Sequence, residues 1–159
     1  MNILIVYDSF FGNTEQIARA IGNALGEPED VGILRAGEVR PEQLTGVKLL
    51  VVGSPTRAFR PTGAVKQFLR RIPSAGLKGV KAAAFDTGIS LSDINSSIGR
   101  SFVKFFGYAA RPVSDKLRKK GAEIAAAPEG FFVEGTEGPL KDGELERAAD
   151  WGRKIAALL

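Results

Sequence analysis

The amino-acid sequence predicts an α/β fold in which a doubly wound, five-stranded parallel sheet carries helices on both faces. Three short apolar runs, at residues 3–7, 49–52 and 80–85, have the length and continuity of strands that are buried on both sides. The segments between them repeat apolar residues at helical spacing. Strands that alternate with helices in this way form right-handed βαβ units, and such units build a parallel sheet.

The other two strands have weaker patterns. Residues 31–34 form a short apolar run, and the fifth strand is interrupted by Pro128, which separates residues 123–126 from residues 131–133. Proline cannot donate a hydrogen bond to a strand ladder, so we expect this strand in two pieces. The connection at residues 41–44 is long enough for only a turn or two, and Pro41 suits a first helical position.

Helices are expected over residues 15–25 and 65–72, and from the region of Pro112 to Lys120, where Gly121 can end the helix. The stretch 90–107 is longer than a simple connection needs and repeats apolar residues at helical spacing. It therefore predicts an extra helix between the fourth strand and the following helix. A final helix should begin near Asp142, whose carboxylate can cap it. Its expected buried residues are Leu145, Ala149, Ile155 and Leu158 or Leu159, with Trp151 packed beside them.

The length and composition favour one globular domain over residues 1–159. No apolar run approaches the ~18 residues of a membrane span. The first residues lack the basic flank and cleavage site of a signal peptide, so we expect a cytoplasmic location. The sequence contains no cysteine and no histidine, which excludes disulfides, thiolate and imidazole metal sites and the Ser-His-Asp triad. We therefore predict no catalytic side chain and no metal site, and difficult chemistry would need a bound cofactor.

The formal charge is +4, with basic residues spaced along the predicted helices. These residues lack interleaved aromatics, so we predict no nucleic-acid partner. The phenylalanine-rich stretch 94–106 is compatible with contact to a membrane surface. Such an apolar stripe is more often part of a core, and we favour the core interpretation.

The loop after the first strand combines a helix start with short polar side chains, in the order Ser9, Phe10, Phe11, Gly12, Asn13, Thr14. Backbone N–H groups at a helix start attract phosphate, and glycine lets a ligand approach the chain closely. The loop has neither the lysine of a nucleotide-triphosphate loop nor the dinucleotide G-x-G-x-x-G spacing. A phosphate monoester fits this pattern, and so does a helix start capped by Ser9 or Asn13.

The run Tyr7-Asp8-Ser9-Phe10-Phe11-Gly12-Asn13-Thr14-Glu15-Gln16-Ile17-Ala18 resembles the flavodoxin family, in which an aromatic strand end precedes a hydroxyl-rich loop and Gly-Asn-Thr-Glu. The run from Gly130 to Leu145 also resembles flavodoxin-domain proteins. The resemblance implies bound flavin mononucleotide (FMN), redox activity and a phosphate site at Ser9, Gly12, Asn13 and Thr14, with Phe11 also among the cofactor-binding residues. Phe11 departs from the family pattern, because a threonine is usual at its position.

Two further loops resemble the segments with which this family holds the isoalloxazine ring. The first contains Pro55, Thr56, Arg57, Ala58 and Phe59 and follows the third strand. Arg57 stands where a tryptophan is frequent and Ala58 where a glycine is frequent, and that glycine permits the peptide flip associated with a stable semiquinone. Phe59 is the nearest candidate for ring stacking, and the alternative is that it only packs the loop against the helix behind Pro61.

The second segment, with Asp86, Thr87 and Gly88, follows the fourth strand and would meet the pyrimidine edge of the flavin. It lacks the stacking tyrosine of the family. A plain turn explains this segment by itself, but three small polar loops at neighbouring strand ends indicate a ligand site together.

The leading functional hypothesis is an FMN-dependent electron carrier, and its basic charge predicts a redox partner with an acidic face. The first alternative is an NAD(P)H:quinone oxidoreductase, in which Arg57 or Arg60 would meet a nicotinamide phosphate or stabilise the anionic reduced flavin. The second alternative is a flavodoxin-like interaction module without flavin. A phospho-accepting receiver domain is disfavoured, because the third strand ends in Val52-Gly53-Ser54 and not in an aspartate.

Overall fold

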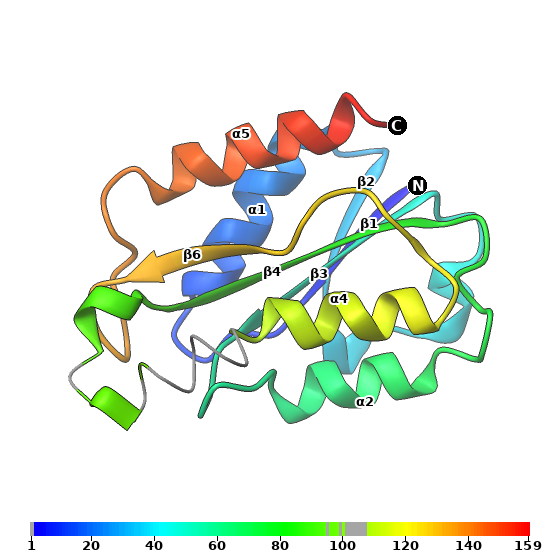
Figure 1. Cartoon of the computed structure of the whole chain (residues 1–159). Helices are drawn as coiled ribbons and strands as arrows, with labels where there is room; N and C mark the ends of the chain where they lie inside the picture. The colour runs from blue at the N-terminus through cyan, green and yellow to red at the C-terminus, as the bar shows by residue number, and fades with distance from the viewer. Residues whose placement is uncertain (1, 95, 99, 101–107) are drawn as a thin grey trace.

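The computed structural model describes residues 2–94, 96–98, 100 and 108–159, and shows a parallel sheet between two layers of helices (Figure 1). The strands are β1 (Ile3–Tyr7), β2 (Val31–Arg35), β3 (Leu49–Pro55), β4 (Lys81–Ile89), β5 (Glu123–Ile124) and β6 (Glu129–Val133). They are ordered β2-β1-β3-β4-β5, and β6 also pairs with β4. The predicted fold class is thus confirmed, and the fifth strand is present as two pieces on either side of Pro128.

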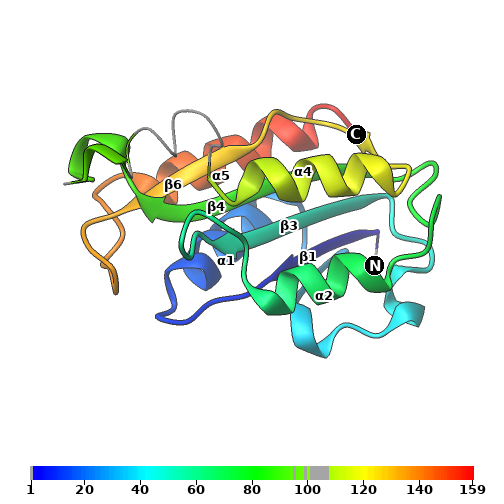
Figure 2. The same cartoon turned by 60° about the horizontal axis from the view of Figure 1, so that its bottom comes forward.

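Helices α1 (Asn13–Leu25) and α5 (Glu144–Ala156) cover one face of the sheet, and α2 (Gly63–Arg71) and α4 (Ala110–Lys119) cover the other (Figures 1 and 2). The connection from β2 to β3 holds two short 3₁₀ helices, η1 (Ala36–Glu38) and η2 (Pro41–Leu44), as its length predicts. Because successive side chains of a strand point to opposite faces, each layer has its own apolar core.

The α1/α5 core contains an aromatic cluster. Phe85 of β4, Phe131 of β6 and Trp151 of α5 lie edge to face, with ring centroids 6.1 to 6.3 Å apart. These rings and Ile155 are almost fully buried. On the other face, Leu50 and Val52 of β3 pack in one cluster with residues of α2 and α4. Both cores hold the strand ends in fixed positions.

Several sequence expectations are wrong in detail. The final helix begins at Glu144 behind Gly143, which has a positive φ of 83°, and no side chain caps it, so Asp142 is not its cap. Leu145, Leu158 and Leu159 are exposed, and the buried stripe is Ala148, Trp151, Gly152 and Ile155. The stripe shifts because Gly152 packs closely against α1, where a Cβ atom would lie 3.0 Å from the carbonyl oxygen of Ile21.

The predicted extra helix, over residues 90–107, falls in part outside the described residues. Within them, Leu91–Asp93 forms a 3₁₀ helix, η3, and the N–H of Arg100 donates to the carbonyl of Ser96 at 2.9 Å. The proposed membrane-surface stretch shares this region, and Phe102, Phe105 and Phe106 lie outside the described residues. No helix in the described part of the chain has the length and apolar character needed to cross a bilayer.

Candidate functional site

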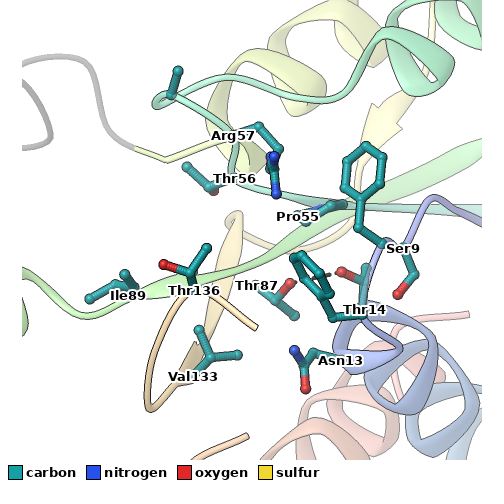
Figure 3. Close-up of a pocket in the computed structure, with 14 residues that line it drawn as sticks. Ser9, Asn13, Thr14, Pro55, Thr56, Arg57, Thr87, Ile89, Val133 and Thr136 are labelled. Atoms are coloured by element: carbon teal, nitrogen blue, oxygen red, sulfur yellow. Dashed lines mark hydrogen bonds between the residues drawn. The ribbon is translucent and has the colours of Figure 1, made fainter. Parts of the chain in front are cut away.

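A cleft of about 280 Å³ lies beyond the carboxyl ends of β1, β3 and β4 (Figure 3). The strand order reverses between β1 and β3, and ligands of doubly wound sheets bind at such a switch point. The predicted site residues that line the cleft are Ser9, Phe11, Asn13, Thr14, Pro55, Thr56, Arg57, Ala58, Thr87 and Gly88. Gly12, Phe59 and Asp86 do not line it.

The loop from β1 to α1 forms one wall of the cleft. Gly12 has a φ of 88°, and a Cβ atom added there would have no neighbour within 4 Å. Its N–H donates to the Ser9 hydroxyl at 3.0 Å, so that hydroxyl stabilises the loop and does not cap the helix. Gly12 therefore gives the loop a left-handed turn with open space beside it.

No side chain of the described residues caps the first turn of α1. In contrast, the Thr62 side chain accepts a hydrogen bond from Val65 N at the start of α2. Asn13 was a candidate cap in the sequence, but its amide nitrogen donates instead to the carbonyl of Glu137 at 3.1 Å. Within the part of the chain that the structure describes, no side chain accepts a hydrogen bond as a cap of α1, and the N–H groups of its first turn give this end of the cleft a partial positive charge.

Arg35 holds this loop in place and was not identified from the sequence. It is the last residue of β2 and lies in register with Tyr7. Its guanidinium donates to the carbonyl of Ser9 at 3.1 Å and to the Glu15 carboxylate at 3.2 Å, and stacks 5.3 Å from the centre of the Tyr7 ring. The hydrogen bond from Arg19 and the charges of both arginines hold the pKa of Glu15 below its usual range.

The floor of the cleft joins α1 to β4 through two hydroxyl groups. Thr14 and Thr87 lie side by side, with their Oγ1 atoms 2.7 Å apart (Figure 3). Both residues are almost fully buried. Thr136, from the segment after β6, also lines the cleft and adds a hydroxyl that the sequence pattern did not indicate.

The segment after β3 forms a tight hairpin. Arg57 and Arg60 exchange two backbone hydrogen bonds of 2.9 Å, and the two residues between them, Ala58 and Phe59, both have positive φ, at 47° and 65°. A two-residue hairpin of this kind requires left-handed backbone at both central positions, which glycine and asparagine adopt more readily. This geometry takes Phe59 out of the cleft lining.

Among the described residues, the aromatic groups that line the cleft are Phe10 and Phe11, both from the first loop. They are 57% and 47% exposed, which is unusual for phenylalanine and leaves their rings available to a ligand. The guanidinium of Arg57 lies 4.8 Å from the centre of the Phe10 ring. Phe10 and Phe11 line the cleft and are further candidates for ring stacking, whereas Phe59 lies outside the cleft lining.

Asp86 differs most from its predicted place. Asp86, Thr87 and Gly88 belong to β4 and not to a loop after it. The Asp86 carboxylate accepts a hydrogen bond from Ala110 N at 2.8 Å and borders a separate cavity of about 450 Å³ near α4 and β6. Burial raises the pKa of Asp86 to about 7. The negative charge of Glu129 also raises this pKa, whereas the hydrogen bond from Ala110 lowers it.

The cleft thus offers an uncapped helix start, hydroxyl groups, exposed aromatic rings and one guanidinium. Within the described residues, no group of acidic side chains could hold a metal ion. This set of groups suits a flat aromatic molecule that ends in a phosphate, since amides can hold the phosphate and phenyl rings can stack on the flat part.

Comparison with known proteins agrees with this class of site. The family model described as flavodoxin matches residues 5–151. No curated protein sequence matches the chain significantly. The chain belongs to the flavodoxin family, whose members bind FMN and transfer electrons.

Solved structures show the same fold. An archaeal flavodoxin is 24% identical, with 99% of this chain and 97% of that chain covered and a TM-score of 0.76. Flavodoxin 2 from Bacillus cereus is 21% identical, with full coverage of both chains and a TM-score of 0.77. Rubredoxin oxygen:oxidoreductase from Desulfovibrio gigas is 21% identical over 98% of this chain, which covers 35% of that protein, with a TM-score of 0.68.

Proposed function

We propose that this chain binds FMN in the cleft and carries electrons between protein partners. The observation that supports this most strongly is the uncapped start of α1, which opens into a cleft with exposed aromatic rings. When bound, FMN supplies one- and two-electron redox chemistry, which the side chains of this sequence lack.

The chain's own residues would bind and orient the cofactor. The first-turn amides of α1 and the hydroxyls of Ser9 and Thr14 would hold the phosphate. Phe10 or Phe11 would stack on the ring, and Arg57 would add positive charge near the flavin. The Thr14–Thr87 contact would keep the helix start and β4 at a fixed separation.

The binding claim can be tested by adding the purified chain to free FMN. We expect the flavin fluorescence to be quenched and the visible absorption bands to shift at micromolar protein. The variants Phe10→Ala and Phe11→Ala should each be compared with Phe59→Ala, because Phe59 lies outside the cleft lining. Free flavin that stays fluorescent with the native chain would instead support an interaction module without cofactor.

The electron-carrier role needs a separate measurement, because Arg57 in the cleft also favours an FMN-dependent NAD(P)H:quinone oxidoreductase. A carrier should oxidise NADH or NADPH only negligibly with a soluble quinone unless a partner reductase is added. Rapid turnover by the FMN-loaded chain alone would make the oxidoreductase the better assignment, and Arg57→Gln should then raise the KM for the nicotinamide. The cytoplasmic location expected from the sequence stays a prediction.

A further inference from the structure

Helices α2 and α4 lie side by side on one face of the sheet and carry an excess of positive charge (Figures 1 and 2). Their basic residues are Lys66, Arg70, Arg71, Arg111, Lys116, Arg118 and Lys119, and we call this surface the basic face. Asp115 is the single acidic residue on these two helices. The net charge of these two helices exceeds the +4 of the whole chain, so the remaining residues together carry a net negative charge.

The opposite helix layer is electrically balanced. The basic residues of α1 and α5 are matched by acidic ones, and ion pairs join Arg19 to Glu15 and Arg153 to Asp150. On the basic face, the described residues form one ion pair, between Arg118 and Asp115 at 3.8 Å. Most cations of the basic face are therefore available to an external anion.

A groove of about 210 Å³ runs between α2 and α4 within the basic face. Leu69 and Val113, both almost fully buried, lie among its lining residues. Lys66, Arg70 and Lys116 also line it and surround this apolar part with charge. Such a groove accommodates one apolar side chain that is flanked by carboxylates.

The basic face continues to the candidate cofactor site. The hairpin with Arg57 and Arg60 connects the end of β3 to the region before α2, and both arginines are exposed. Arg57 also lines the cleft. A molecule that extends from the basic face toward the cleft would thus meet further positive charge at Arg57 and Arg60.

We propose that the basic face is the docking surface for an acidic segment of a partner protein, with one apolar side chain of that segment in the α2/α4 groove. That the partner exchanges electrons rests on the proposed function, whereas the docking itself does not. The described exposed large apolar residues all lie outside α2 and α4, which disfavours insertion into a membrane. Phe68 is the aromatic residue of these helices and is 2% exposed, so neither helix offers a platform for base stacking.

The proposal is tested with a fluorescein-labelled peptide of three Glu-Glu-Leu-Glu-Glu units, titrated with the full chain in the presence and absence of FMN and followed by anisotropy. We expect the double variant Lys66→Glu/Lys116→Glu to weaken binding about tenfold or more. The control Arg153→Glu/Lys154→Glu makes the same charge change on α5 and should weaken it less than about twofold, because salt screens charges on the far face at about 0.15 M. Replacing the leucines of the peptide by serine should also weaken binding.

Equal losses in the two double variants would overturn the proposal, since they would indicate attraction by net charge alone. Stronger binding of single-stranded DNA or phosphatidylserine vesicles through the same lysines, without competition by the peptide, would also overturn it in favour of a nucleic acid or a membrane. FMN quenching should be unchanged in Lys66→Glu/Lys116→Glu, because neither lysine lines the cleft. Peptide binding by a chain that fails to quench FMN would leave the docking surface intact and refute the redox function.

Discussion

Asp86 is a buried carboxyl group, 2% exposed, that accepts a hydrogen bond from the backbone amide of Ala110. Its pKa is about 7 in the folded chain, compared with about 3.9 in an unfolded one. Between about pH 4 and pH 7 the Asp86 carboxyl is therefore ionised in the unfolded chain but still protonated in the folded chain. The contribution of Asp86 to the free energy of unfolding is therefore largest below about pH 4. It falls as the pH rises from 4 to 7 and stays constant at its lower value above pH 7.

Replacing Asp86 by asparagine keeps an acceptor for Ala110 and removes the buried charge. We expect Asp86→Asn to unfold with a free energy higher by a few kcal/mol at pH 8, and to lose this part of the pH dependence. Urea unfolding at pH 4.5, 6 and 8 measures both effects. Asp115→Asn, an exposed change at the same cavity, is the control, and equal pH profiles for Asp86→Asn and the native chain would contradict the assignment.

Ala58 has a left-handed backbone, with a φ of 47°, in the hairpin beside the cleft. Such a conformation costs an L-residue about 1–2 kcal/mol, and glycine avoids it at some loss of chain entropy. We expect Ala58→Gly to stabilise the fold by about 0.5–1 kcal/mol. Ala20→Gly, inside α1, should destabilise it by about 1 kcal/mol.

Thermal unfolding of both glycine variants checks this difference in sign. Destabilisation by Ala58→Gly would show that the hairpin is not left-handed in solution. Redox titration of the FMN-loaded Ala58→Gly variant would also show whether the separation between its two midpoint potentials changes. The family resemblance implies such a change, because glycine is frequent at this position and permits the peptide flip associated with a stable semiquinone.

The Phe85 ring of β4 lies directly over Gly53, its register partner in β3, because Gly53 has no side chain. A Cβ atom at Gly53 would lie 2.1 Å from the Phe85 ring, which is fully buried in the aromatic cluster. We expect Gly53→Ala to destabilise the fold by about 1–3 kcal/mol or more, since the ring must leave its position. Gly63→Ala, at the exposed start of α2, meets no atom within 4 Å and should be neutral or stabilising.

Denaturant unfolding distinguishes these two alanine variants, which add the same methyl group in different surroundings. A native-like midpoint for Gly53→Ala would mean that the β3–β4 contact is looser than the structure shows. Because Gly53 lies just before the cleft residues of β3, we also expect its alanine variant to bind FMN more weakly.

Sequence patterns located the elements better than their ends. The apolar runs stop at Val52 and Phe85, but β3 and β4 continue for several residues. The pattern misses these strand ends because Ser54, Asp86 and Thr87 are polar and nevertheless buried. Their burial depends on hydrogen bonds to other elements, such as Thr62 N to the Ser54 hydroxyl at 3.1 Å. Hydrophobic periodicity contains no information about such bonds.

The candidate site was predictable where it is local in the sequence. The loop around Gly12 combines a turn, polar side chains and a helix start within a few residues, so its position could be inferred. Arg35 and Thr136 reach the same site from β2 and from the segment after β6, and only the strand order brings them there. Phe59 lies outside the cleft lining, and the left-handed backbone that places it there could not be inferred from its residue type.

At the scale of the whole molecule, the basic face and the cleft occupy different parts of the surface around one sheet. The net charge of +4 gives no indication that positive charge is concentrated on α2 and α4. The cleft lies at the carboxyl ends of the strands, and the basic face lies along one helix layer. Association with an acidic partner should therefore slow with added salt, whereas electron transfer to a neutral small acceptor should not.

The most direct measurement of the central claim is a calorimetric titration of the chain with FMN and with riboflavin, which differ by the phosphate. If the start of α1 holds that phosphate, FMN should bind at least about 100-fold more tightly than riboflavin, a difference of about 2.7 kcal/mol. Equal affinities would contradict the placement of the phosphate at α1, and the absence of binding by either flavin would contradict the FMN-dependent function itself.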